Sequence, residues 1–231
     1  MMISNLKLPL LYSEKRLLED LVICEKEQFV DHFNVSNYEG KWESIALQSV
    51  GGEAQNIFAN PNEERPYEKT PLLLKCPYFH EIIDSFKCDK ESIRLLRLRA
   101  NSKIKVHKDH NLSYEDGYFR IHIPIKTNPA VSFVINDEKV PMGVGECWYG
   151  NFNLPHWVHN NGDSDRVHLV MDCIRNDWSN KLFLKAGYIF EDENQKTNYS
   201  DETKLQMISE LKRIDTPVAR QLIEQLESEL S

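Results

Sequence analysis

The sequence has few cysteines and lacks long basic or apolar runs, and each absence excludes a class of protein. Its five cysteines are scattered, with no C-x-x-C pair, which argues against a disulfide framework or a structural zinc site and favours a reducing compartment. The net charge of −8 and the lack of a Lys/Arg cluster exclude a nucleic-acid partner. No stretch approaches the roughly 18 apolar residues of a membrane span, and the amino terminus lacks the apolar core of a signal peptide. We therefore expect a cytoplasmic globular protein.

The 231 residues correspond to about one domain with appendages. The first zone mixes helix and strand. Ser13 can cap a helix in which Leu17, Leu21 and Phe29 follow near-helical spacing. The remaining predictions for this zone are a strand over 41–50 ended by Gly51-Gly52, a polar loop over 53–69 and a short amphipathic helix over 78–86.

The second zone, about residues 92–175, is a succession of short strands. The segments IRLLRLR, KIKVH, FRIHIPI, VSFVI, CWYGNF and RVHLVMDC are rich in β-forming residues and separated by turn residues. Asn136-Asp137 is typical of a hairpin tip. This spacing, without an intervening helical pattern, predicts a sandwich or barrel of antiparallel strands.

The third zone is helical. Ser200 or Asp201 begins one helix, and the Thr216-Pro217 pair begins another as N-cap and first residue. We expect a domain over 1–180 with a helical N-terminal elaboration, followed by a C-terminal helical tail over 200–231. The apolar stripes of the tail either pack on the barrel or form a homodimer.

Six of the eight histidines lie between residues 107 and 168. In an extended segment, residues i and i+2 point to the same side, so His107 and Asp109 can present an imidazole and a carboxylate to one ion. A second histidine from a distant strand would complete two histidines and one carboxylate, the set used by non-haem Fe(II) oxygenases. His-x-Asp alone is a weak signal. His156, His159, His110 and His168 all remain candidates at this point.

Two strands each carry an arginine followed two residues later by a histidine. Arg120 and His122 share one face of FRIHIPI, and Arg166 and His168 share one face of RVHLVMD, opposite an apolar face in each strand. Arginine binds carboxylates through two parallel hydrogen bonds. The pattern therefore favours a site for a dicarboxylate co-substrate such as 2-oxoglutarate, with solvent-facing charges as the alternative.

Together the blocks RLRANSKIKVHKDH, GYFRIHIPIKTN and GECWYGNFNLPHWVHNNGDSDRVHLVMD resemble the aspartyl/asparaginyl β-hydroxylase family, which includes bacterial proline hydroxylases. GKWES and TPLLLKCPYFHEII fit it more loosely. The resemblance implies a double-stranded β-helix (jelly roll, cupin-like), mainly β with flanking helices, that binds Fe(II) and 2-oxoglutarate.

The resemblance also implies roles for individual residues. The proximal histidine falls on His107, and bacterial members carry the aspartate that is Asp109 here. The distal histidine lies ten residues before the arginine that binds the far carboxylate of 2-oxoglutarate, which selects His156 over His159 and assigns Arg166. Arg120 and His122 match an Arg-x-His that binds 2-oxoglutarate or lines its pocket, and His168 is placed with them because it shares the face of Arg166. The short helical tail, and Asn151 where proline hydroxylases carry an acidic residue, depart from those relatives.

The predicted function is an Fe(II)- and 2-oxoglutarate-dependent dioxygenase that uses O₂ to hydroxylate an unactivated C–H. Its substrate is an amino acid, or an amino-acid residue (Asp/Asn-type) in a peptide or protein. The iron ligands are His107, Asp109 and His156, and the co-substrate is held by Arg120, His122, Arg166 and His168. The alternatives are a metal-dependent cupin enzyme of another class, such as an isomerase, and a non-catalytic cupin binding module.

Overall fold

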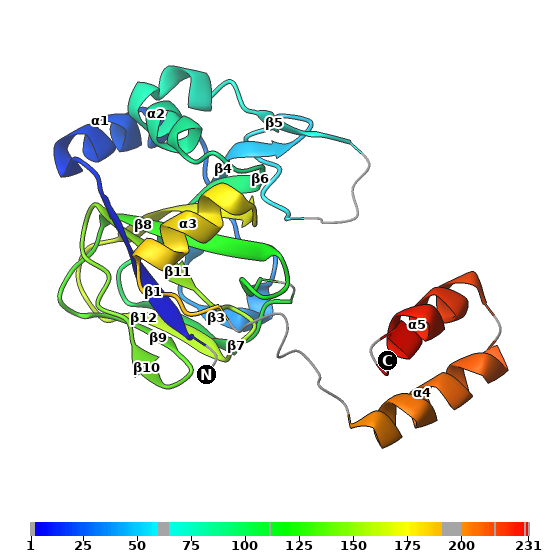
Figure 1. The fold of residues 1–231 in the computed structure, drawn as a ribbon. Coiled ribbons are helices and arrows are strands. Elements are labelled where there is room, and N and C mark those ends of the chain that lie inside the picture. Colours follow the sequence, from blue (N-terminus) through cyan, green and yellow to red (C-terminus); the bar gives the residue numbers. More distant parts are fainter. Residues whose placement is uncertain are drawn as a thin grey trace. The chain divides into compact units, whose positions relative to one another are not determined.

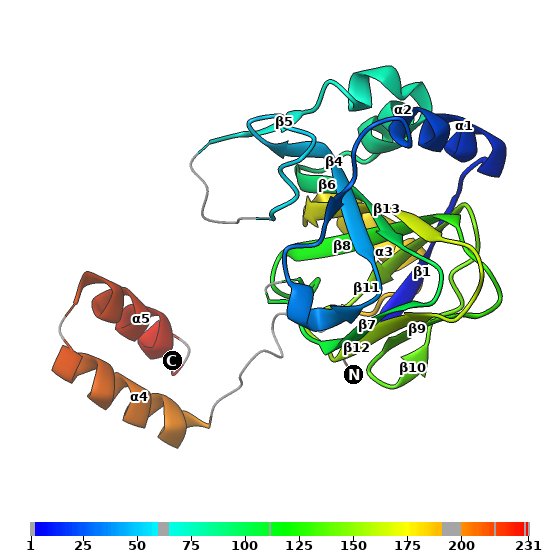
Figure 2. The same ribbon diagram turned by 180° about the vertical axis from the view of Figure 1, so that it is seen from behind.

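Two antiparallel sheets form the body of the protein in a computed structural model that describes residues 3–59, 65–110, 112–190, 200–214, 216–228 and 230. The major sheet has the strand order β1-β11-β8-β13-β6-β4-β2 with β5 beside β4, and the minor sheet has the order β10-β9-β12-β7-β3 (Figures 1 and 2). The strands are β1 (Asn5–Leu11), β2 (Val30–Asp31), β3 (Tyr38–Glu39), β4 (Trp42–Val50), β5 (Tyr67–Lys69), β6 (Lys90–Leu98), β7 (Ser102–His107), β8 (Tyr118–Lys126), β9 (Val131–Ile135), β10 (Glu138–Lys139), β11 (Glu146–Gly150), β12 (His156–Asn160) and β13 (Arg166–Ile174).

A shared apolar core lies between the two sheets. The major sheet contributes Trp42, Leu96, Trp148 and Val170, and the minor sheet contributes Ile104, Phe133, Ile135 and Val158. Strands β6, β8 and β13 lie side by side in the major sheet and are buried along most of their length. Their inward-facing residues therefore line the space between the sheets, as in a jelly roll. The predicted double-stranded β-helix is confirmed.

Two tight turns show how local sequence fixes this arrangement. Asn136 and Asp137 both adopt positive φ angles, 49° and 64°, and join β9 to β10 with Ile135 paired to Glu138. Asn and Asp tolerate this conformation, which a two-residue hairpin needs, so the predicted hairpin tip is confirmed. Gly145 has a φ of 76°, and an added Cβ would lie 2.4 Å from the Tyr12 carbonyl oxygen. Only glycine allows β1 and β11 to approach this closely.

Helices α1 (Glu14–Cys24) and α2 (Pro77–Ser85) pack against each other at one end of the sheets (Figure 1). Ser13 caps α1, as predicted, by accepting a hydrogen bond from the Arg16 backbone N–H at 3.5 Å. The Asp20 carboxylate of α1 accepts backbone N–H bonds from Tyr78 and Phe79 at 2.8 and 2.7 Å. A carboxylate at a helix N-terminus satisfies otherwise unpaired donors and complements the helix dipole. The predicted helices are thus fastened to each other.

Several elements were not predicted. Strand β1 pairs with β11, and helix α3 (Asp177–Lys185) begins with a capping box between Asn176 and Ser179. The loop predicted over 53–69 contains strand β5, while residues 60–64 lie outside the described part. Phe29 lies beyond the end of α1, where its ring packs 3.8 Å from the Arg97 guanidinium carbon. Its spacing was coincidental, because α1 already ends at Cys24.

Residues 189–231 form a second unit, separate from residues 1–188. It contains α4 (Asp201–Ile214) and α5 (Pro217–Ser228), which pack against each other. Ser200 and Thr216 accept backbone N–H bonds from Thr203 and Ala219, at 3.2 and 3.1 Å, so both helices begin where predicted. Their packing on the barrel or in a dimer stays a prediction. No helix among the described residues has both the length and the apolar character needed to cross a membrane.

Candidate active site

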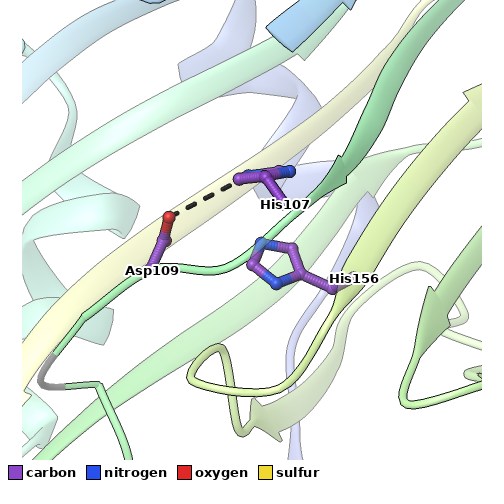
Figure 3. A group of neighbouring side chains, drawn as sticks. All are labelled: His107, Asp109 and His156. Atoms are coloured by element: carbon purple, nitrogen blue, oxygen red, sulfur yellow. Dashed lines mark ion pairs between the residues drawn. The ribbon is translucent and has the colours of Figure 1, made fainter.

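Two neighbouring strands bring His107 and His156 together. His107 ends β7, and it pairs directly with His156, the first residue of β12. The two imidazole centroids lie 4.1 Å apart. Asp109 follows on the loop after β7, where its backbone N–H donates to the Phe152 carbonyl at 2.9 Å. One ligand atom from each of His107, Asp109 and His156 lies within 4.8 Å of the others (Figure 3), and we call these residues the triad.

Hydrogen bonds to the backbone fix both imidazoles. His107 Nδ1 lies 2.8 Å from the Lys105 carbonyl oxygen, and His156 Nδ1 lies 3.0 Å from the Leu154 carbonyl oxygen. Because a carbonyl only accepts, the proton of each neutral ring belongs on Nδ1, and Nε2 keeps a free lone pair. This arrangement is common where a second hydrogen bond orients a metal-binding histidine. His107 Nε2 lies 3.9 Å from Asp109 Oδ1, along the dashed line in Figure 3.

The electrostatic environment leaves donor atoms unprotonated. Burial lowers the pKa of His156 to about 4, assisted by its neighbour His107. Burial alone would raise the pKa of Asp109, but Arg120 and the two histidines outweigh it and hold that pKa below its ordinary value. His156 and Asp109 are therefore unprotonated near neutral pH, and together with the His107 imidazole they form a set of ligands that suits a divalent transition metal.

Arg120 joins the triad to a chain of buried charges. Its Nη1 donates to Asp109 Oδ2 at 2.5 Å, while Nε and Nη2 donate to the Asp172 carboxylate at 2.5 and 3.0 Å. Arg94 Nη2 donates to the same carboxylate at 2.8 Å. Two arginines and two aspartates thus alternate in one chain, which orients Asp109. The guanidinium that we predicted to bind 2-oxoglutarate is engaged with two carboxylates, and its co-substrate role stays a prediction.

Arg166 and two histidines form a second polar group between the sheets, which we call the arginine pocket. Arg166 is only 1% exposed, and its Nη2 lies 2.8 Å from His168 Nδ1, which in turn lies 3.2 Å from His122 Nδ1. Within the described part of the chain, Arg166 has no carboxylate partner, and Arg166 Nε and His122 Nε2 are buried without a hydrogen bond.

The charge of Arg166 is therefore poorly compensated. Burial lowers its pKa to about 9, and burial also takes the pKa values of His122 and His168 well below their ordinary range. A buried cation without a counter-ion is costly and is normally paired. The pocket thus has the chemistry of an anion site whose ligand would satisfy these unpaired donors.

A single aromatic side chain links the triad to the arginine pocket. The Phe152 ring centroid lies 4.8 Å from that of His156 and 5.1 Å from that of His122. Phe152 is buried in the same core cluster as Phe133, over which the Arg166 guanidinium lies at 5.3 Å. The two groups therefore share the interior of one jelly roll.

Two cavities reach these groups. One, of about 430 Å³, is lined by His107, Asp109, Arg120, Arg94 and Asp172, together with residues of the 32–37 and 107–112 segments. We call it the triad cavity. The other, of about 350 Å³, is lined by Arg166 and His168 and by the loops around 127–131 and 139–142. The triad cavity has the size of a small-ligand pocket.

Other candidate residues fall into distinct places. His110 and Tyr118 line the triad cavity, whereas Trp148 and Tyr149 are buried. His159 is partly exposed beside the Trp157 ring, at 4.4 Å, while His156 on the same strand is buried. The two histidines therefore lie on opposite sides of β12, as their spacing predicted.

Sequence reasoning missed several residues of the triad cavity, among them His32, Trp42 and Arg94. His32 stacks on Trp42 with ring centroids 3.5 Å apart, and both line the cavity with Arg94. Arg94 could have been found from the sequence, because a charged residue on the buried face of an apolar strand needs a partner. His32 could not have been found in this way, because its stacking on Trp42 depends on the pairing of β2 with β4.

Known proteins resemble this one in sequence and in fold. Residues 15–176 match the sequence profile of a family described as Aspartyl/Asparaginyl beta-hydroxylase. L-proline cis-4-hydroxylase of Rhizobium meliloti (strain 1021) is 30% identical over 165 residues, which cover 70% of this chain and 57% of that protein. An oxidoreductase of the 2OG-Fe(II) oxygenase family from Burkholderia pseudomallei has a similar fold, with a TM-score of 0.53 at 12% identity over 75% of this chain and 86% of that one.

The fold and the triad define a jelly-roll protein with two histidines and one carboxylate close together, of which His107 and Asp109 line a cavity. Because the profile match covers more than half of its length, the chain belongs to the aspartyl/asparaginyl β-hydroxylase family. It spans 57% of the length of the curated relative that it matches.

Proposed function

We propose that this protein is an Fe(II)- and 2-oxoglutarate-dependent dioxygenase that hydroxylates an unactivated C–H of an amino acid. The proposal rests on one observation: a single jelly roll contains two incomplete binding sites. The triad offers an open set of metal ligands, and Arg166 is a buried guanidinium without a counter-ion among the residues that the structure describes. Iron and a dicarboxylate would satisfy both.

The residues fit these two partners. His107, Asp109 and His156 would hold Fe(II) on one face, leaving positions for 2-oxoglutarate and O₂. Arg166 would bind the far carboxylate of 2-oxoglutarate, with His122 and His168 as further members of that pocket. When bound, iron and 2-oxoglutarate supply the oxidising power of the reaction, in which O₂ yields a hydroxylated substrate, succinate and CO₂.

The protein's own groups orient and protect this chemistry. Backbone carbonyls fix the two imidazoles through Nδ1 and leave Nε2 free as a ligand atom, and Arg120 holds Asp109 in its ionised form. The apolar side chains of Phe133 and Phe152 pack beside Arg166 and His122. Apolar, fixed surroundings strengthen each of these electrostatic interactions.

The substrate class is supported by the size of the triad cavity and by the relatives. A volume of about 430 Å³ accommodates an amino acid or one residue of a peptide, and the matched relative is an L-proline cis-4-hydroxylase. The family description names aspartyl and asparaginyl substrates instead. A free amino acid, and an Asp/Asn-type residue of a peptide or protein, are therefore the two candidates.

All of the proposed site residues precede residue 180, which supports a catalytic domain over 1–180 with the helices of 200–231 as an appendage. We expect a chain ending at residue 190 to keep substrate-independent 2-oxoglutarate turnover. Loss of that turnover in a folded, metal-binding truncated chain would assign the helices to the catalytic unit.

A metal-dependent cupin enzyme of another class, such as an isomerase, would use the triad without an anion beside Arg166. Anaerobic addition of Fe(II) and 2-oxoglutarate separates the two functions. The dioxygenase predicts a weak visible charge-transfer band, and succinate release once oxygen is admitted. No band, and activity without oxygen, would favour the other class.

A further inference from the structure

The charged residues that line the triad cavity are paired among themselves with few exceptions. Arg94, Arg120, Asp109 and Asp172 form the ion-pair chain described above, with two positive and two negative side chains. His32 is neutral, because burial and the nearby Arg94 lower its pKa to about 3. The ion-pair chain and His32 therefore add little net charge to the cavity.

Glu91 is the exception inside the cavity. It lies near the start of β6, is partly buried and lines the cavity together with Tyr118 and Asp172. In the described part of the chain, its carboxylate has no ion pair and no hydrogen bond, and its interaction with Asp172 is repulsive. Burial and this repulsion raise its pKa. Such a carboxylate is stabilised when a cation enters the cavity.

A second unpaired charge of opposite sign lies on the same cavity. Lys108, between His107 and Asp109 in the sequence, is exposed, and its ammonium group has no partner in the described residues. Among the described residues that line the cavity, the free charges are thus one carboxylate and one ammonium. A free α-amino acid carries the complementary pair at neutral pH, whereas a residue inside a peptide carries neither charge on its backbone.

We propose that Glu91 binds the charged amino group of the substrate and so selects free amino acids over peptides and other N-acylated compounds. This inference rests on the proposed hydroxylase function and names the substrate class of the same site. A hydrogen bond from an ammonium group to a partly buried carboxylate is stronger than a neutral one. N-acylation removes that charge and leaves Glu91 without its partner.

The test measures succinate release by the full-length protein with Fe(II) and 2-oxoglutarate. The probes are the twenty proteinogenic amino acids and their N-acetyl derivatives, each with wild type, Glu91→Gln and the control Asp89→Asn. Asp89 is exposed, two residues earlier, and outside the cavity lining, so the control makes the same charge change on the same segment.

We expect only unblocked amino acids to stimulate wild type. Glu91→Gln should raise KM for the best of them by about 10- to 100-fold with little change in kcat, while Asp89→Asn behaves as wild type. Turnover of 2-oxoglutarate without substrate should be unchanged in the control Asp89→Asn. Because the Glu91 carboxylate repels Asp172 and makes no hydrogen bond or ion pair with the described residues, Glu91→Gln should not lower the melting temperature, as loss of a structural contact would.

Equal stimulation by N-acetyl and free forms, or an unchanged KM in Glu91→Gln, would overturn the inference. It would also fall if no free amino acid stimulated an enzyme that turns over 2-oxoglutarate alone, and the hydroxylase function would then stand. Absence of all 2-oxoglutarate turnover in iron-loaded wild type would overturn the proposed function, and this inference with it.

Discussion

Arg120 holds Asp109 through one guanidinium nitrogen while it binds Asp172 through two others. The carboxylate assigned to the metal is therefore fixed by the same side chain that joins the buried ion-pair chain. Removal of Arg120 would affect the fold and the metal site by different routes. The buried Asp172 would lose a partner, and Asp109 would lose its orientation and the charge that holds down its pKa.

Substitution of Arg120 separates these two effects. Arg120→Lys keeps the positive charge but cannot bind two carboxylates through a planar fork. We expect the variant to fold and to bind Co²⁺, used as a spectroscopic probe, about 10- to 100-fold more weakly than wild type. Anaerobic titration measures this. Unchanged Co²⁺ affinity would show that Arg120 does not position Asp109.

The two triad histidines should be equally necessary, and His159 should not be. His107→Ala and His156→Ala each remove one nitrogen ligand of the proposed iron site, so we expect both to abolish 2-oxoglutarate turnover with and without substrate. His159→Ala is the matched control, because His159 lies on the same strand as His156 with its side chain outside the site. Retained succinate production in both triad variants would refute the iron assignment.

Part of this site was predictable from short-range sequence alone. His107 and Asp109 come together because i and i+2 share a side at the end of a strand. The hairpin tip at Asn136-Asp137 and the starts of α1, α4 and α5 follow from turn and capping chemistry. Each of these signals depends on a few neighbouring residues, and each appears where the sequence predicted it.

The rest of the site depends on the register between strands that are distant in the sequence. The choice of His156 came from family spacing, since nothing local shows that β12 pairs with β7. The ion pairs of Arg120 could not be predicted for the same reason. Its spacing to His122 matched that of Arg166 to His168, but the register of β8 on β13 pairs Arg120 with Asp172. A one-residue difference in that register would change its partner.

Acid should destabilise the metal-free protein through its buried histidines. His32 has a pKa lowered to about 3, and those of His122 and His168 lie well below 6.5. In the unfolded chain these rings take up protons near their ordinary pKa of 6.5, so stability is full above that pH and falls below it. Each such ring adds about 1.4 kcal/mol per pH unit to the slope.

Urea unfolding of wild type and His32→Gln between pH 8 and pH 4.5 tests this account. The free energy of unfolding of wild type should be flat above about pH 7 and fall below it. Below that pH, the free energy of unfolding of the variant should fall less steeply than that of wild type, by about 1.4 kcal/mol per pH unit. This difference in slope does not depend on the stability of the variant at pH 8. Parallel profiles for the two proteins would mean that His32 is protonated in the folded state.

Arg166 offers the sharpest contrast with Arg120, because the Arg120 guanidinium is paired with two carboxylates and the Arg166 guanidinium is paired with none in the described part of the chain. Arg120→Met breaks contacts with two carboxylates and should lower the free energy of unfolding by about 3–5 kcal/mol. Arg166→Met removes a buried charge that lies beside His168 and the Phe133 ring and has no carboxylate partner among the described residues. We therefore expect its stability without ligands to stay within about 1 kcal/mol of wild type.

The same Arg166→Met variant should lose its response to 2-oxoglutarate. In wild type, Co²⁺ and 2-oxoglutarate together should raise the melting temperature above that with Co²⁺ alone, because a ligand that binds only the folded state stabilises it. In Arg166→Met the Co²⁺ effect should persist and the further increase should disappear, since the triad is intact and the anion partner is gone. A full 2-oxoglutarate shift in the variant would show that the far carboxylate is bound elsewhere. In that case Arg120, the other buried guanidinium that we predicted for this role, would be the next candidate.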